Sequence, residues 1–130
     1  MIDHISVGVS DIARSTIFYE AIFAPLGLTR LIERRGTVGF GKAYPEFWIN
    51  LREGMARVPA GSGSHICFRA RTTADVEAFY AAALKAGGAD DGVPGLRPHD
   101  RVTYFAAFVT DPDGNRIEAV TFLKDDLVSG

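Results

Sequence analysis

The stretch Met1-Ile2-Asp3-His4-Ile5-Ser6-Val7-Gly8-Val9 decides the fold, because a similar stretch returns as Ser64-His65-Ile66-Cys67-Phe68-Arg69-Ala70. Each stretch has a histidine near its start and leads through a polar link into a helical pattern. His65 follows His4 by 61 residues, and the same offset relates three further pairs of identical residues, Phe18 to Phe79, Tyr19 to Tyr80 and Gly27 to Gly88. Similarity at one fixed offset over so many positions indicates a duplicated unit.

Side chains in both stretches alternate with a period of two, as they do in a half-buried strand. In the first stretch one side is apolar, formed by Ile5, Val7 and Val9, and the other carries His4 beside small residues. In the second stretch the histidine side is formed by His65, Cys67 and Arg69. We therefore expect both histidines on one face of a sheet whose opposite, apolar face packs against helices.

A helical pattern follows each of these strands. Ser10-Asp11 offers an N-cap and an acidic first turn for the first helix, which Pro25 and Gly27 end. Thr72 or Thr73 caps the second helix, which Gly87-Gly88 end. The apolar stripes that we expect to be buried are Ile12, Ile17, Phe18, Ala21 and Ile22 in the first helix and Val76, Phe79, Tyr80, Ala83 and Leu84 in the second.

Short strands complete each half of the chain. We predict three after the first helix, at 28–33, 37–41 and 46–51, and two near the end, at 102–109 and 116–122, joined by a hairpin turn at 111–114. Residues 89–98 are too polar and too broken to assign, and the tail from Lys124 is expected to fray. Residues 52–63, rich in Gly and Pro, join two units at 1–52 and 64–123 within one α+β domain.

Composition limits the function. The 130 residues suit one domain, with 47% hydrophobic and 23% charged residues, as in ordinary globular proteins. A net charge of −2 gives no basic footprint for nucleic acid or for an anionic membrane surface. No apolar run approaches the length of a membrane span, and no targeting segment is evident. The single cysteine, Cys67, cannot form an internal disulfide, so we expect a cytoplasmic protein.

The chain resembles the vicinal oxygen chelate superfamily, which includes glyoxalase I, fosfomycin resistance proteins, bleomycin resistance proteins and ring-cleaving dioxygenases. The motifs that carry the resemblance are Ile2-Asp3-His4-Ile5, Val9-Ser10-Asp11 with Phe18-Tyr19, Ser64-His65-Ile66 and, above all, Asp111-Pro112-Asp113-Gly114-Asn115-Arg116-Ile117-Glu118. The resemblance covers nearly the whole chain. It implies two βαβββ units that form a cupped, eight-stranded mixed sheet with the helices on its outer face, in a homodimer.

The resemblance also implies a metal site. Members that bind metal take a histidine from the first strand of each unit and acidic or polar groups from the last strand, which here points to His4, His65 and Glu118. The implied cofactor is a divalent metal, namely zinc, nickel, manganese or iron. The alternation supports this set independently, because it puts both histidines on the cup side. Matching Ile117-Glu118-Ala119 with Ile49-Asn50-Leu51 puts Asn50 at the fourth position, where glyoxalase I carries a carboxylate.

This departure from glyoxalase I removes the usual candidate for the base. Two imidazoles and one carboxylate leave open positions on a metal, where a substrate can chelate through two adjacent oxygens. The set is similar to those of the fosfomycin resistance proteins and of non-haem iron oxygenases. However, the end of the chain lacks a basic cluster suited to a phosphonate, and ring-cleaving dioxygenases are usually much longer.

Other residues are candidates for the substrate pocket and for catalysis. His99, Arg97 and Tyr104 flank the unassigned segment and are candidates for an acid, an anion clamp and a hydroxyl donor, with a solvated loop as the alternative. Trp48 shares its predicted face with Asn50, so it either walls the cavity or packs in the core.

Cys67 lies two residues from His65 on the same predicted face. It either lines the pocket or is an inert, small apolar side chain, which is the commoner role of a buried cysteine.

We therefore expect a metal-dependent enzyme acting on a small molecule with adjacent oxygens, of the lyase, isomerase or transferase type. The alternative is a metal-free protein that binds or sequesters a ligand, similar to the bleomycin resistance proteins. A third reading is a duplicated scaffold whose histidines have no role. The substrate cannot be inferred, because unrelated reactions share this fold and metal.

Overall fold

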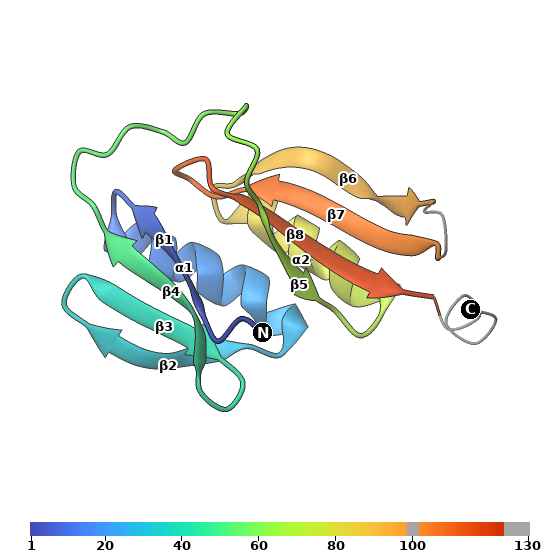
Figure 1. Ribbon diagram of the computed structural model, residues 1–130, viewed down its shortest axis with the longest axis horizontal. Coiled ribbons are helices and arrows are strands. Elements are labelled where there is room, and N and C mark those ends of the chain that lie inside the picture. The colour runs from blue at the N-terminus through green and yellow to red at the C-terminus, as the bar shows by residue number, and fades with distance from the viewer. Residues whose placement is uncertain (99–101, 124–130) are drawn as a thin grey trace.

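The computed structural model describes residues 1–98 and 102–123, and within them it contains two helices and eight strands (Figure 1). The first half contains β1 (Ile5–Val9), α1 (Ile12–Phe23), a short 3-10 helix η1 (Ala24–Leu26), β2 (Thr29–Arg34), β3 (Thr37–Gly41) and β4 (Pro45–Leu51). The second half contains β5 (Ile66–Arg69), α2 (Thr73–Lys85), β6 (Ala89–Arg97), β7 (Tyr104–Thr110) and β8 (Arg116–Phe122). The predicted α+β class and its two βαβββ units are confirmed.

The strands form two four-stranded mixed sheets with the same topology, in the orders β1-β4-β3-β2 and β5-β8-β7-β6. In each sheet the first strand pairs in parallel with the last, and the remaining pairs are antiparallel. Within the described residues no ladder of hydrogen bonds joins β1 to β5, so the sheets remain separate at these two edges. Both helices lie behind the sheets on one side, which leaves the other side open (Figure 1).

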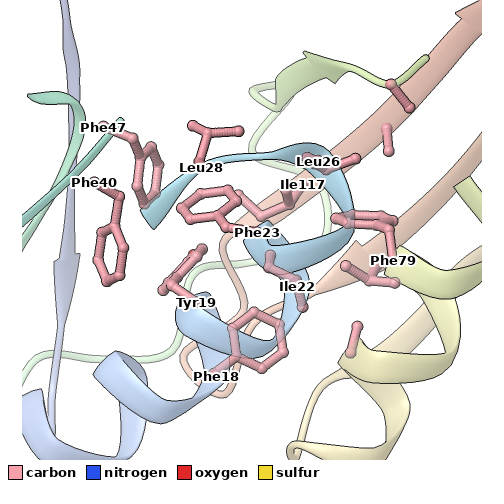
Figure 2. Packing of buried hydrophobic residues seen from close by; sticks show 14 of the residues in the cluster. Phe18, Tyr19, Ile22, Phe23, Leu26, Leu28, Phe40, Phe47, Phe79 and Ile117 are labelled. Atoms are coloured by element: carbon pink, nitrogen blue, oxygen red, sulfur yellow. The ribbon is translucent and has the colours of Figure 1, made fainter. Parts of the chain in front are cut away.

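One core lies between the helices and the sheets and draws on both halves of the chain (Figure 2). The ring of Phe23 on α1 lies 5.3 Å from that of Phe47 on β4 and 4.9 Å from that of Phe68 on β5. Such aromatic pairs in near-perpendicular arrangements add to the stabilisation that comes from burial. Residues of both units thus contribute to the same core.

The helix stripes were predicted only in part. Phe18 and Ile22 on α1 are buried, as are the predicted Val76, Phe79 and Ala83 on α2. The predicted burial of Ile17 and Leu84 was wrong, because these residues are 65% and 43% exposed. Instead, the buried face of α1 includes Ser15 and Thr16, whose small side chains allow close packing.

The structure identifies the N-cap residue of each helix. Asp11 itself is the N-cap of α1, and its carboxylate accepts a hydrogen bond from the Arg14 backbone N–H at 3.0 Å. The first turn of α1 therefore holds no acidic residue, contrary to the prediction. Thr72 caps α2 in the same way through Asp75 N–H, at 3.1 Å. At the end of η1, Gly27 adopts a left-handed conformation with φ 79°, as expected of a helix terminator.

The segment that the sequence left unassigned is the strand β6. It lies at the edge of its sheet and pairs with β7 through two register shifts near Gly92. Its proline, Pro94, is tolerated because an edge strand does not need every backbone N–H for a ladder. The register shifts near Gly92 interrupt the period-two alternation of side chains, so alternation did not predict this strand.

The predicted hairpin turn between β7 and β8 ties the two halves of the chain together. The Asp111 carboxylate accepts hydrogen bonds from the backbone N–H of Asp113 and Asn115 and, at 2.6 Å, from the Tyr19 hydroxyl on α1. Asn115 Nδ2 also donates to the Gly8 carbonyl on β1, at 2.9 Å. We call Tyr19, Asp111, Asp113 and Asn115 the latch. The motif that carried the family resemblance thus has a structural role.

The helices within residues 1–98 and 102–123 include none with the length and apolar character of a membrane span. His99 and the tail from Lys124 lie outside the described residues.

Candidate functional site

The open side of the sheets carries the residues that alternation assigned to it. On β1 the apolar residues Val7 and Val9 contact the core, so the alternate residues Ser6 and Gly8 point away from the helices. On β8 the core holds Ile117 and Ala119, which leaves Glu118 on the open side.

His65 and Glu118 meet on the open side of the second sheet. Glu118 pairs in register with Cys67, two residues beyond His65. The His65 ring donates through Nε2 to Glu118 Oε1 at 2.9 Å. The carboxylate side chain is only 8% exposed, whereas the imidazole is 46% exposed. A nearly buried carboxylate thus lies beside a half-exposed imidazole ring.

His4 does not join this pair. It lies just before β1 and is exposed, and its Nδ1 is 2.7 Å from the Asp3 carboxylate. No three His, Cys, Asp or Glu side chains within the described ranges come close enough together to hold one metal ion. The predicted set of His4, His65 and Glu118 is therefore not assembled within one chain.

The first sheet does not repeat the arrangement of the second. Asn50 pairs with Gly8, four residues beyond His4, whereas Trp48 pairs with Ser6, two residues beyond His4. By strand register, Trp48 rather than Asn50 occupies the position that corresponds to Glu118. The Asn50 side-chain oxygen instead accepts a hydrogen bond from the Thr37 hydroxyl at 3.0 Å.

Trp48 is half-buried on the open side, where its ring covers Gly39. A Cβ atom at Gly39 would lie 2.9 Å from the Trp48 ring. Trp48 is therefore packed against its own sheet while still presenting part of the indole to the open side.

Cys67 lies beside Glu118 and reaches the surface in part. Burial of the thiol, together with the negative charge and hydrogen bonding of Glu118, raises the pKa of Cys67 to about 12. The residue is therefore a neutral thiol near pH 7 rather than a thiolate nucleophile.

Arg97 and Tyr104 lie on neighbouring strands and pair in register at one end of the second sheet. The Arg97 guanidinium lies 5.8 Å from the Phe108 ring centre and donates to the Val93 carbonyl at 2.6 Å. The Tyr104 ring lies 6.1 Å from that of Phe122. His99, the other proposed acid, lies outside the described residues.

Sequence reasoning gave no role to Arg69 or Phe108. The Arg69 guanidinium lies 4.8 Å above the Phe122 ring, and the Phe108 ring lies 6.0 Å from the His65 ring. Alternation already put Arg69 on the face of His65, so its sequence position was a usable signal. Phe108 had no such signal, because its place depends on the pairing of β7 with β8.

Comparison with known families gives the family of the chain. Residues 1–119 match the model of a family described as the glyoxalase/bleomycin resistance protein/dioxygenase superfamily. The chain belongs to this superfamily. No curated protein matches it.

Solved structures of the superfamily share the fold. A glyoxalase/bleomycin resistance protein from Albidiferax ferrireducens is similar with a TM-score of 0.83 and 30% identity, over 93% of this chain and 98% of that one. A family enzyme from Burkholderia phytofirmans has a TM-score of 0.72 and 17% identity, over 93% and 98% of the two chains. A mutant of glyoxalase I from Zea mays has a TM-score of 0.70 and 22% identity, over 97% of this chain and 47% of that one. The last two likenesses concern the fold alone.

Proposed function

We propose that the protein is a metal-dependent enzyme acting on a small molecule with adjacent oxygens, and that its metal site is shared between two copies of the chain. The observation that carries the proposal is the pair formed by His65 and the nearly buried Glu118 on the open side of the second sheet. Burying a carboxylate is unfavourable unless a cation or hydrogen-bond donors compensate. A divalent cation would do so beside an imidazole.

The geometry of this pair fits half of a metal site. Ligand atoms bound at about 2.1 Å to one divalent ion lie roughly 3 Å apart when they are neighbours in its coordination shell. His65 Nε2 and Glu118 Oε1 are 2.9 Å apart, so a metal could take the place of the shared hydrogen. Imidazole and carboxylate suit zinc, nickel, manganese and iron alike.

The other half requires a second copy. His4 is an exposed imidazole just before β1, and among the described residues of its own chain it does not form a three-ligand cluster with the pair. In a dimer with two-fold symmetry, His4 of each copy can approach the His65–Glu118 pair of the other, which forms two equivalent sites. We therefore propose His4, His65 and Glu118 as ligands, with His4 supplied by the second copy of a homodimer.

The remaining residues of the open side suit a substrate pocket. The metal, when bound, would act as a Lewis acid toward the oxygens of the substrate. Arg97 offers a guanidinium without a carboxylate partner in the described part of the chain, and Tyr104 offers a hydroxyl. Trp48 and Asn50 would wall the pocket from the first sheet. The general base and a contribution from His99 stay predictions, as does the cytoplasmic location.

Metal content tests this proposal. Untagged protein, measured by elemental mass spectrometry, should hold about one divalent metal per chain. Glu118→Gln should lose it, because a neutral amide is a much weaker metal ligand than a carboxylate. As a matched control, Glu53→Gln removes the same charge from an exposed residue outside the sheets and should keep the metal. Wild-type protein that stays empty after added metal is dialysed away would contradict the proposal.

The alternative function is metal-free binding or sequestering of a ligand, similar to the bleomycin resistance proteins. One observation favours it, which is that the His65 ring itself donates a hydrogen bond to the Glu118 carboxylate. It predicts that wild-type protein and Glu118→Gln show the same negligible metal content.

A further inference from the structure

A hollow of about 300 Å³ lies between the facing edges of the two sheets, and His4 and Cys67 are among the residues that line it. We propose that this seam hollow binds a small organic carboxylate. Its apolar wall is formed by Ile5, Leu28, Ile66 and Phe68, and its cationic rim by Lys42 and Arg69. The inference goes beyond the proposed function, because neither His65 nor Glu118 lines the hollow.

The hollow exists because β1 and β5 do not pair. Each is the edge strand of its own sheet, and within residues 1–98 and 102–123 no ladder closes the space between them. The chain before β1 and the link between β3 and β4 line the same space, through Ile2 and Lys42. Figure 1 shows the N-terminus between the two sheets at this end of the molecule. Side chains from both halves thus form one concave surface.

The charges of the lining leave two cations available. Among the described residues, neither Lys42 nor Arg69 has a carboxylate within ion-pair distance. The two acids in the lining have other contacts. Asp3 lies 2.7 Å from the His4 ring, and Glu46 accepts a hydrogen bond from the Lys42 backbone N–H at 3.3 Å. An anion in the hollow would therefore meet the Lys42 ammonium and the guanidinium of Arg69, which also lies 4.8 Å above the Phe122 ring.

The chemistry of the lining selects a carboxylate on an apolar body. A guanidinium presents parallel N–H donors that match the two oxygens of a carboxylate. The apolar wall would bury a ring or a short hydrocarbon chain, which a small inorganic anion does not provide. The volume is near the lower end for ligand pockets, which suits a molecule the size of a single-ring acid.

Benzoate and benzamide are the probes that test this inference. They have nearly the same shape, but only benzoate is charged. Titration of the ¹⁵N-labelled full chain, followed by NMR, should show saturable shifts for the amides of Leu28 and Phe68 with benzoate. Benzamide should bind at least about tenfold more weakly, because it forms no charge-assisted hydrogen bond. Equal binding of the two probes would overturn the inference.

Variants assign the binding to the rim. Arg69→Met and Lys42→Met keep much of the apolar stem and remove the charge, so each should weaken benzoate binding by roughly tenfold. Arg34→Met is the matched control, since it makes the same change at an exposed residue of β2 and should leave the affinity unchanged. If Arg69→Met fails to fold, Lys42→Met and Arg69→Lys carry the test, the latter with partly retained affinity. Unchanged affinity in the folded rim variants would overturn the inference.

The titration is run on the protein as purified and again after treatment with EDTA. Saturable shifts should persist, because neither cation of the rim, Lys42 or Arg69, is a proposed metal ligand. Benzoate binding by a protein that never holds metal would support the hollow and contradict the metal site. A protein that holds metal but shows no saturable shifts would overturn the hollow alone.

Discussion

The two sides of the sheets differ in how deeply their side chains are buried and in how their charged groups are paired. On the covered side, aromatic residues such as Tyr19, Phe23 and Phe47 are at most 1% exposed, and the Asp111 carboxylate has several hydrogen-bond donors. On the open side His65 is half-exposed, and Arg69 and Arg97 have no carboxylate partner within the described residues. The covered side therefore supplies stability, while the open side presents cationic groups that no carboxylate of the described residues neutralises.

Glu118 is the exception on the open side, because it is charged and nearly buried. Such groups are commonly retained at sites of function, where stability is not the only demand on them. The comparison thus predicts large losses of stability from changes in the latch and smaller ones from changes on the open side.

The largest effect is expected from Asp111→Ala. This change leaves the Tyr19 hydroxyl and the N–H groups of Asp113 and Asn115 without their acceptor in a buried place, which should lower the free energy of unfolding by about 3 kcal/mol or more. Urea unfolding measures the loss. Asp91→Ala is the matched control, since it breaks only a surface ion pair with Arg116 and should cost about 1 kcal/mol or less. Similar losses in the two variants would contradict the distinction between the sides.

A smaller loss is expected from Gly39→Ala on the open side of the first sheet. The new Cβ atom would lie 2.9 Å from the Trp48 ring and 3.0 Å from Pro45, so the indole must shift. Overpacking of this kind typically costs about 1–3 kcal/mol. The same substitution at Gly61, where the space around a Cβ atom is open, should change the free energy of unfolding little. If Gly39→Ala is as stable as wild type, the contact between Trp48 and its sheet is not tight.

The smallest effect is a dependence on pH that comes from the latch. Burial raises the pKa of Asp111 above its ordinary value of 3.8, while hydrogen bonds from Tyr19 and Asn115 act in the opposite direction. The folded protein therefore keeps this proton to a higher pH than the unfolded chain does. The contribution of Asp111 to the free energy of unfolding must then fall as the pH rises through the interval between the two pKa values.

Asp111→Asn does not titrate and lacks this fall. The difference in free energy of unfolding, wild type minus variant, should therefore decline as the pH rises from 3.8 through that interval. Urea unfolding of both proteins at a series of pH values measures it. A difference that increases with pH over the same range would mean that folding lowers the pKa of Asp111.

Much of this architecture could be predicted from residue patterns. Period-two alternation put His65 and Cys67 opposite Ile66 and Phe68, because each strand buries only one face. The turn residues at 111–114 located the last hairpin, since Pro, Asp and Gly favour tight turns. These features depend on neighbours in the sequence.

Features that depend on tertiary contacts were missed or misplaced. Ile17 is exposed although it is apolar, because the position of α2 decides which face of α1 is buried. Alignment of the two units made Asn50 the equivalent of Glu118, whereas strand register shows that Trp48 occupies the equivalent position. Whether His4 joins the His65–Glu118 pair depends on how the two sheets meet at their unpaired edges, and no local pattern encodes that.

The most direct test of the shared metal site is the metal content of a mixed dimer. His4→Ala and Glu118→Gln are each expected to bind no metal alone. In a heterodimer of the two, purified with distinct removable tags, one site receives both changes and the other receives neither. The account predicts that the heterodimer regains one metal ion per dimer in elemental mass spectrometry after the tags are removed. A heterodimer as empty as its parents would contradict a site built from two chains.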